Sequence, residues 1–302
     1  MDTDLLELRR SKARDWQSKT QKSQPSRSRS PRRSVMDIDA GVQESLRVLT
    51  WNVDGLNENA EVEDLLGRTL WVTEEIARIR PHVIFLQELV DFSFSIIEQR
   101  CGNSFHVFRQ GNCDQPYFVA ILVHKATMKV EGNAMPVRFP NSLMGREGLY
   151  VSAKLKEDTR SPCIGFLTAH LESMREYASE RKNQYEICAK YIEKQQVDFS
   201  FFGGDLNARE VDVPPSISSY DCWVTAGRPS DHQYTWDLTR NMNASFPNGS
   251  QPRCRFDRMY LIPGRDTQKR ELMKFELVGT TTIPNLGDAS DHFGVLVEIS
   301  LK

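Results

Sequence analysis

Hydrophobic and polar positions alternate along the chain in blocks that predict strands and helices in turn. Leu46 to Val53 alternates and ends at Asp54-Gly55, which predicts a strand and a turn. Residues 61–80 have apolar positions at helical spacing up to Pro81, and residues 180–194 form a second amphipathic stretch. The other apolar runs, two of which end in polar residues, predict strands: Val83 to Glu88, Pro116 to His124, Leu149 to Leu155, Ile164 to His170, Phe199 to Phe202, Phe256 to Ile262 and Asp291 to Ile299. This order predicts an α/β sandwich, with a two-layered sheet core flanked by helices.

Polar side chains recur at the ends of these apolar runs. The residues in question are Asn52, Glu88, His170, Asp205, Asn207, Asp291 and His292. One such position is equally compatible with an ordinary turn, because Asp, Asn and Gly are common turn residues. Their repetition is more informative, because the ends of neighbouring strands share one edge of a sheet and functional residues gather there. We therefore expect these side chains to converge at one rim.

The residue types at this rim predict phosphoester hydrolysis. Asn52 and Glu88 offer hard oxygen ligands, which suit Mg²⁺ or Mn²⁺ better than zinc. Asp205 can take a proton from an attacking water that Asn207 orients. The sequence contains neither a P-loop nor a Gly-x-Ser-x-Gly nucleophile motif, which argues against nucleotide-dependent transfer and acyl transfer.

Two histidines complete the predicted chemistry. Asp291-His292 is typical of a pair in which a carboxylate orients an imidazole, and His170 can donate to a phosphate oxygen. A cation and imidazoles together stabilise the charge that develops on phosphate oxygens. Taken singly, each histidine is equally compatible with a structural hydrogen-bonding role.

Charge is distributed unevenly along the 302 residues. Met1 to Ser34 contains ten Lys/Arg and four Asp/Glu, a formal charge of +6, so the remainder carries −8 of the total of −2. The Ser/Arg-rich stretch from Gln24 to Ser34 has too few apolar residues to fold alone. We expect residues 1–44 to be a disordered basic tail that directs nuclear import or contacts nucleic acid, and residues 45–302 to be one catalytic domain. A solvated linker is the alternative for the tail.

Cysteine usage and hydropathy predict an intracellular protein. The six cysteines are scattered without a Cys-x-x-Cys pair, and no apolar run is long enough to span a bilayer. We expect reduced thiols and no membrane partner.

Five motifs in order resemble those of the endonuclease/exonuclease/phosphatase superfamily. They are Thr50-Trp51-Asn52-Val53-Asp54-Gly55-Leu56, Leu86-Gln87-Glu88, His170-Leu171-Glu172-Ser173, Gly204-Asp205-Leu206-Asn207 and Ser290-Asp291-His292. The resemblance covers the chain from about Leu46 onward. It implies a DNase I-like four-layered α/β sandwich, in which two packed mixed sheets are flanked by helices, and Mg²⁺-dependent phosphodiester or phosphomonoester hydrolysis.

Further motifs resemble the 5′-tyrosyl-DNA phosphodiesterases of this superfamily. These motifs are Tyr117-Phe118-x-Ala120-Ile121, Arg175 after the His170 motif, Gln233-Tyr234-Thr235-Trp236-Asp237 and Arg255-Phe256-Asp257-Arg258. The resemblance implies that Asn52 and Glu88 hold the metal, that Asp205 and Asn207 position water, that His170 and His292 bind the scissile phosphate, and that Asp291 orients His292. It also implies a groove for single-stranded 5′-terminal DNA, lined by Tyr117, Arg175, Arg209, Trp236 and Phe256.

The implied substrate is a DNA 5′-phosphate covalently linked to a topoisomerase 2 tyrosine, and the implied role is repair of DNA breaks. The same chemistry would permit cleavage of protein linked to an RNA 5′ end. We expect a nuclear monomer. The alternatives are another phosphodiesterase of this fold, such as an abasic-site endonuclease or an RNA-directed nuclease, and a non-catalytic nucleic-acid adaptor. Leu206, where this family is expected to have Thr, and Phe293, where it is expected to have Trp, depart from the pattern.

Overall fold

The structure is a computed structural model that describes residues 43–57, 61–111, 115–156, 161–243, 246, 249–266 and 270–301. Of the predicted tail, residues 1–42 lie outside the described residues. The first strand, β1, begins at Ser45.

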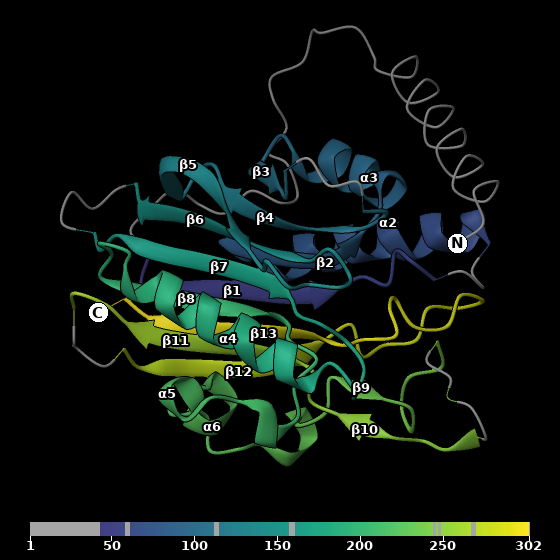
Figure 1. The fold of residues 1–302 in the computed structure, drawn as a ribbon. Helices are drawn as coiled ribbons and strands as arrows, with labels where there is room; N and C mark the ends of the chain where they lie inside the picture. Colours follow the sequence, from purple (N-terminus) through teal and green to yellow (C-terminus); the bar gives the residue numbers. More distant parts are fainter. Residues whose placement is uncertain are drawn as a thin grey trace, which may run out of the picture.

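Two mixed β-sheets form the centre of the molecule (Figure 1). The six-stranded sheet has the order β12-β13-β1-β2-β4-β3, and its strands are Leu272–Val278, Gly294–Ser300, Ser45–Asn52, Val83–Leu89, Phe118–His124 and Phe105–Arg109. The five-stranded sheet has the order β11-β8-β7-β6-β5, and its strands are Asp257–Pro263, Phe199–Asp205, Ile164–His170, Glu147–Leu155 and Met128–Arg138. Each sheet has one parallel pair, β1 with β2 and β7 with β8, which leaves the carboxyl ends of each pair at the same edge.

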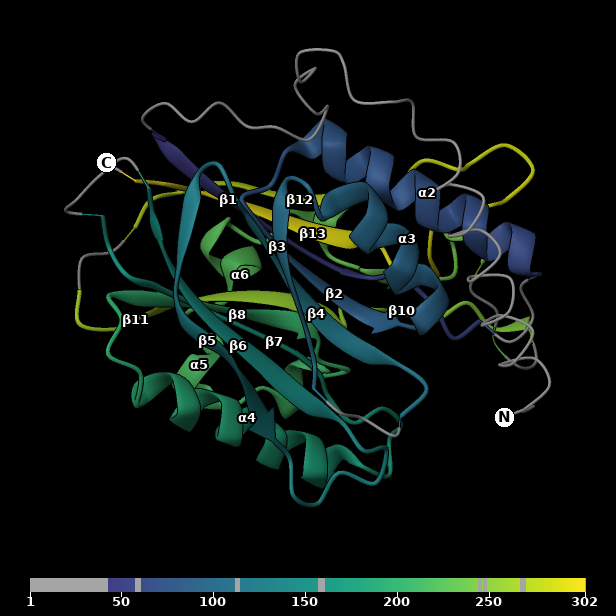
Figure 2. The same cartoon turned by 90° about the horizontal axis from the view of Figure 1, so that it is seen from above.

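Helices cover the outer faces of the two sheets. Helices α2 (Val62–Ile79) and α3 (Asp91–Cys101) lie on the six-stranded sheet, and α4 (Ala178–Glu193) lies on the five-stranded sheet, on the opposite side of the molecule (Figure 2). Helix α2 ends where Arg80 adopts a left-handed conformation before Pro81. These four layers confirm the predicted four-layered α/β sandwich.

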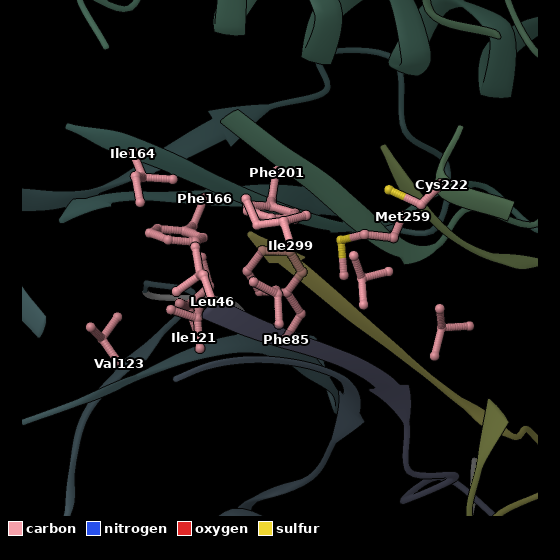
Figure 3. Packing of buried hydrophobic residues seen from close by; sticks show 14 of the residues in the cluster. Leu46, Phe85, Ile121, Val123, Ile164, Phe166, Phe201, Cys222, Met259 and Ile299 are labelled. Atoms are coloured by element: carbon pink, nitrogen blue, oxygen red, sulfur yellow. The ribbon is translucent and has the colours of Figure 1, made fainter. Parts of the chain in front are cut away.

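The main core lies between the sheets and is built from apolar residues that face each other across them. Leu46 and Phe85 from one sheet pack in the same cluster as Phe166 and Phe201 from the other (Figure 3). The rings of Phe166 and Phe201 are stacked, with centroids 5.9 Å apart. Since each of these side chains is almost fully buried, the cluster holds the two sheets in a fixed alignment.

Three strands of the two central sheets, β3, β5 and β12, were not predicted from the sequence, and neither were the two short strands β9 (Trp236–Asp237) and β10 (Arg253–Cys254). The first three are edge strands of their sheets. Strand β5 is mostly exposed or half-buried, so it lacks the buried apolar run that identifies a central strand. Between β8 and β11 the chain forms short helical turns, Glu210–Asp212, α5 (Pro215–Ser218), α6 (Cys222–Thr225) and Ser230–His232, and the two-stranded ribbon β9 (Trp236–Asp237) and β10 (Arg253–Cys254).

None of the helices in the described part of the chain combines the length and apolar character that a membrane crossing requires. The five cysteines within the described ranges are unpaired.

Candidate active site

Four predicted site residues meet where the parallel pairs of the two sheets end. The Nδ2 atom of Asn52 donates to Glu88 Oε1 and to Asp205 Oδ2, both at 3.0 Å. The Nε2 atom of His170 lies 3.2 Å from the same Asp205 oxygen and 3.8 Å from Glu88 Oε1. Asn52 and Glu88 come from one sheet and His170 and Asp205 from the other, so the site spans the junction between them.

At two strand ends the backbone adopts unusual conformations that bring these side chains together. Glu88 has φ 53°, in the left-handed region, where the pairing of β2 with β4 shifts register between Leu86 and Leu89. Gly204 has φ 145°, and a Cβ there would lie 2.0 Å from the Ala169 carbonyl oxygen. A glycine before Asp205 therefore allows β7 and β8 to approach closely at the site.

A cross-sheet hydrogen bond lies beside the site. The Nε2 atom of Gln87 donates to Thr168 Oγ1 at 3.0 Å, and both side chains are buried. This bond joins β2 to β7 next to Glu88 and His170.

The carboxylate that contacts His292 through Nδ1 is Asp257, which corrects the predicted role of Asp291. The distance from His292 Nδ1 to Asp257 Oδ2 is 2.7 Å. Asp291 Oδ1 lies 3.9 Å from the other ring nitrogen, Nε2, and Asp291 Oδ2 accepts a hydrogen bond from Trp236 Nε1 at 3.2 Å. The physical reason is the pairing of β11 with β8, which places Asp257 opposite Asp205 and within hydrogen-bonding distance of His292 Nδ1.

Asn207 lies just beyond Asp205, as predicted. Its backbone N–H donates to Asp205 Oδ1 at 3.1 Å, and its Nδ2 atom donates to the Leu171 carbonyl at 3.1 Å. Asn207 has φ 48°, a left-handed conformation that Asn tolerates better than most residues. With its nitrogen atoms engaged in this way, the carboxamide oxygen is left to accept a hydrogen bond from a water or a substrate group.

The electrostatics of the site give the two imidazoles different charges. Burial and the Arg146 charge lower the pKa of His170 to about 4, so this ring is neutral. Burial would also lower the pKa of His292, but the nearby Asp257, Asp291 and Asp205 raise it well above its ordinary value, so this ring is protonated.

The pKa values of the carboxyl groups of Asp205 and Glu88 are shifted in opposite directions. Burial raises the pKa of Asp205, but His170 and His292 outweigh it and hold that pKa below its ordinary value, so the group is ionised. Burial, Asp291 and Asp54 raise the pKa of Glu88 to about 8.

This carboxylate-rich donor set fits a divalent cation. Glu88, His170 and Asp205 offer ligand atoms within 4.8 Å of one another, and Asp205, Asp257 and His292 do the same. The raised pKa of Glu88 shows that its negative charge lacks compensation from the protein alone. Carboxylate and amide oxygens are the ligands that Mg²⁺ and Mn²⁺ prefer.

Aromatic rings flank both histidines. The Tyr117 ring lies 5.9 Å from the His170 ring, and the Phe256 ring lies 6.4 Å from the His292 ring. Trp236 lies 5.7 Å from Phe256 and extends that side. All three aromatic side chains are half-buried, so each has an exposed part near the site.

The two predicted groove arginines, Arg175 and Arg209, are exposed. Arg209 directly precedes the turn Glu210–Asp212 and lies two residues after Asn207. No contact between either guanidinium and the central cluster is observed among the described residues.

Sequence reasoning missed Asp257 and Arg146. Asp257 was noticed only as part of a motif, because its place in the site depends on the pairing of β11 with β8, which the sequence pattern does not give. Arg146 precedes β6 in a loop without periodicity, and its hydrogen bonds to Tyr117 and to the Leu171 carbonyl depend on tertiary structure alone.

Comparisons with known proteins show which sequences and structures this chain resembles. No protein-family model matches the chain. It is 32% identical to tyrosyl-DNA phosphodiesterase 2 of Gallus gallus over 259 residues, which cover 83% of this chain and 66% of that protein. It is 30% identical to tyrosyl-DNA phosphodiesterase 2 of Rattus norvegicus over 271 residues, which cover 85% of this chain and 67% of that protein. The match to the first of these relatives spans just under two thirds of its length.

Solved structures show the same relationship. Tyrosyl-DNA phosphodiesterase 2 of D. rerio, complexed with a single-strand DNA product, is 27% identical and superposes with a TM-score of 0.76, covering 85% of this chain and 100% of that one. An endonuclease/exonuclease/phosphatase family protein of Bacteroides thetaiotaomicron is 15% identical, with a TM-score of 0.62 and coverage of 84% and 97%, and shares the fold. With two imidazoles and a buried carboxylate cluster at the junction of two sheets, the chain belongs to the tyrosyl-DNA phosphodiesterase 2 family.

Proposed function

We propose that this chain is a metal-dependent 5′-tyrosyl-DNA phosphodiesterase, which hydrolyses the bond between a tyrosine and a DNA 5′-phosphate. The observation that carries the proposal is the position of Asp205 Oδ2, which lies 3.2 Å from His170 Nε2 and 3.8 Å from His292 Nε2. An ionised carboxylate between two imidazoles can accept a proton from a water that attacks phosphorus, while both rings bind the oxygens of the phosphate. The family of the chain supports this choice of reaction.

The residues divide the reaction between them. A water bound near Asp205 and Asn207 attacks phosphorus as Asp205 accepts its proton, and the bond from phosphorus to the tyrosine oxygen breaks. The products are a DNA 5′-phosphate and a tyrosine phenolate that takes a proton from solvent. Protonated His292 stabilises the negative charge that develops on a phosphoryl oxygen.

Asn52 and Glu88 are the residues that would hold Mg²⁺ or Mn²⁺. When bound there, the cation would supply positive charge to the phosphoryl oxygens. The close approach of Asn52 to both Glu88 and Asp205 supports one shared position for the cation and the reacting phosphate.

We infer that the DNA is single-stranded near its 5′ end and that the linked protein is a topoisomerase 2 peptide. The aromatic side chains Tyr117, Trp236 and Phe256 would stack on bases or sugars without sequence preference, as this substrate requires. The exposed Arg175 and Arg209 would contact backbone phosphates. A family member from D. rerio has been solved with a single-strand DNA product, which supports the same class of ligand here.

The decisive experiment is cleavage of a single-stranded oligonucleotide that carries a 5′-phosphotyrosine, in Mg²⁺ or in EDTA. We expect release of tyrosine and a 5′-phosphate in Mg²⁺ and no reaction in EDTA or with Asp205→Asn. An abasic-site duplex and an RNA with a 5′-linked peptide serve as parallel substrates. Incision of the abasic duplex without release of tyrosine would overturn the proposal in favour of an abasic-site endonuclease.

We further propose that the protein acts in the nucleus in the repair of DNA breaks. The support is the basic Ser/Arg-rich composition of residues 24–34. A fluorescent protein fused to residues 1–44 should accumulate in nuclei, whereas the same fusion with Arg27, Arg29, Arg32 and Arg33 changed to Ala should not. Equal distribution of the two fusions would remove this role from the tail.

A further inference from the structure

One buried guanidinium connects the two loops that carry the exposed arginines of the proposed DNA groove. Arg181 lies near the beginning of α4 and is 4% exposed. Its Nη1 atom donates to the carbonyl oxygens of Glu172 and Met174, at 2.8 and 2.9 Å, and its Nη2 atom donates to Asp212 Oδ2 at 3.2 Å. The same Asp212 oxygen accepts the backbone N–H of Arg209 at 3.1 Å. Arg181 thus ties the segment that follows β7 to the turn that follows β8.

The segment after β7 contains a strained backbone conformation that Arg181 stabilises. Met174 has φ 65°, in the left-handed region, which is disfavoured for residues other than glycine, asparagine and aspartate. The Met174 side chain is 61% exposed, so burial of this side chain does not explain the conformation. Its carbonyl accepts the hydrogen bond from Arg181. Because Arg175 is the next residue, the direction in which its exposed side chain leaves the backbone depends on this bond.

The turn that carries Arg209 is fixed from its other end by two more buried arginines. Arg258 donates to the Ala208 carbonyl at 2.9 Å, and its guanidinium also donates to the Glu210 carboxylate at 3.1 Å. Arg255 donates to the same carboxylate at 2.8 Å. Since Arg258 belongs to β11, the turn is attached to the five-stranded sheet without any contribution from α4.

We propose that Arg181 is a positioning residue that places Arg175, relative to Arg209, for contact with a backbone phosphate of the bound DNA strand. The proposal rests on the function proposed above. Because the Arg209 turn is held by its own contacts, Arg181 transfers that fixed position to the Arg175 segment. A segment that is already ordered loses less conformational entropy when it binds a phosphate, so the contact becomes stronger. Arg181 therefore affects DNA affinity through Arg175 and leaves the contribution of Arg209 unchanged.

The salt dependence of DNA binding tests for the loss of one phosphate contact. The ligand is a single-stranded oligonucleotide with a plain 5′-phosphate, which is the proposed product, and fluorescence anisotropy gives Kd between about 50 and 200 mM KCl. We expect Arg181→Gln to raise Kd about 3- to 10-fold at the lower salt concentration and to reduce the slope of log Kd against log salt by about 0.7, the value for one phosphate contact of a single strand. An unchanged slope would overturn the proposal.

Two double-mutant cycles identify the partner of Arg181. Arg181→Gln should change Kd by less than about 2-fold in an Arg175→Ala background, because the phosphate contact has already been removed. In an Arg209→Ala background it should keep its full effect on Kd. A full effect in the absence of Arg175, or a lost effect in the absence of Arg209, would contradict the proposal.

A second variant separates the geometry of the bridge from the buried charge. Arg181→Lys keeps a positive charge opposite Asp212 and so disturbs folding less than Arg181→Gln, but one ammonium group cannot span both loops as a guanidinium does. We expect Arg181→Lys to lower the salt slope as Arg181→Gln does, with an unfolding midpoint closer to that of the wild-type protein. A wild-type slope for Arg181→Lys would overturn the proposal.

Lys190→Ala is the matched control, because Lys190 is an exposed cation on the same helix that pairs with Glu186. It should leave Kd within about 2-fold of wild type and the slope unchanged. A reduction of the slope equal to that of Arg181→Gln would show that any charge lost from α4 has this effect, and would contradict the role of Arg181.

The binding readout separates this proposal from the proposed function. If the wild-type protein binds the oligonucleotide but releases no tyrosine from the tyrosyl substrate, the proposed function fails and the salt slopes still decide the role of Arg181. Absence of single-stranded DNA binding by the wild-type protein would overturn both. In a crystal structure of Arg181→Gln we expect Met174 to leave the left-handed region and Arg175 to move away from its present position. Retention of both would overturn the positioning role, whatever the substrate is.

Discussion

The Nδ1 atom of His292 lies 2.7 Å from Oδ2 of Asp257, and both residues are buried. Asp257 belongs to β11 and His292 precedes β13, so the contact joins the two sheets. This carboxylate holds the imidazole with Nε2 directed at Asp205, 3.8 Å away. The protonation of His292 and its direction are thus set by the same neighbour.

Replacing Asp257 by Asn should remove both effects. We expect kcat to fall by about 10²- to 10⁴-fold with KM nearly unchanged, because a neutral amide does not raise the pKa of His292 and holds its Nδ1–H less strongly than a carboxylate does. Steady-state kinetics on the tyrosyl oligonucleotide give the measurement. Asp231→Asn, at an exposed position, is the control and should behave as wild type. A kcat within 5-fold of wild type for Asp257→Asn would show that His292 does not need this partner.

Glu88→Gln should make the protein more stable and less active. Burial and the neighbouring Asp291 and Asp54 raise the pKa of Glu88 to about 8, so folding disfavours its ionised form above pH 4.5. The amide removes that penalty, and we expect a gain of about 1–3 kcal/mol in the free energy of unfolding in EDTA at pH 7.5. Activity should fall by at least about 10³-fold.

Chemical denaturation with and without Mg²⁺ measures the first effect. Added Mg²⁺ should raise the unfolding midpoint of the wild-type protein and leave that of Glu88→Gln nearly unchanged. Equal stabilisation of both proteins by Mg²⁺ would place the cation elsewhere.

Trp236→Leu should weaken substrate binding more than it slows the reaction. Stacking of a base on an aromatic ring contributes about 1–3 kcal/mol, so we expect KM for the tyrosyl oligonucleotide to rise about 5- to 100-fold. Trp236→Phe retains a ring and should recover most of the affinity. A chromogenic phosphodiester without neighbouring bases should be cleaved with a similar KM by all three proteins. A KM increase of the same size on that small substrate would remove Trp236 from base stacking.

His82 should make the fold sensitive to acid at a site remote from catalysis. Burial and the neighbouring Arg47 and His124 lower the pKa of His82 to about 3. Its Nδ1 atom accepts from the Arg47 N–H at 3.0 Å, so this nitrogen must be unprotonated. Below pH 6.5 the unfolded chain therefore binds a proton at His82, whereas the folded protein does not bind it until the pH is near 3. The free energy of unfolding consequently decreases as pH falls from 6.5 toward 3.

The expected slope from His82 reaches about 1.4 kcal/mol per pH unit within that window. Urea denaturation at pH 7, 6 and 5 measures it. His82→Asn keeps an acceptor and a donor without titrating, and it should lose less stability than wild type between pH 7 and 5. Parallel pH dependence of the two proteins would show that His82 is not responsible.

Sequence reasoning was most successful where a buried strand ends in a polar residue. Asn52, Glu88, His170 and Asp205 each follow an apolar run, and this local pattern was enough to predict their convergence. Asp257 begins a strand, so its role depends on which strand lies opposite, and a linear pattern does not contain that information. Arg146 contacts the backbone oxygen of Leu171, a distant segment of the chain, and only the folded chain reveals such a contact. Edge strands were missed for a related reason, since they lack a second buried face.

The hydrogen bond from Gln87 to Thr168 has a consequence for how this protein loses function. Neither sheet carries all of the catalytic residues. Catalysis therefore depends on the alignment of the residues of one sheet with those of the other across the interface between the sheets. A sliding of one sheet along the other by about an ångström would misalign these residues while leaving most of the apolar core intact. Catalytic activity should therefore be lost at a lower temperature than the temperature at which the protein unfolds. The catalytic rate thus reports on how one sheet packs against the other.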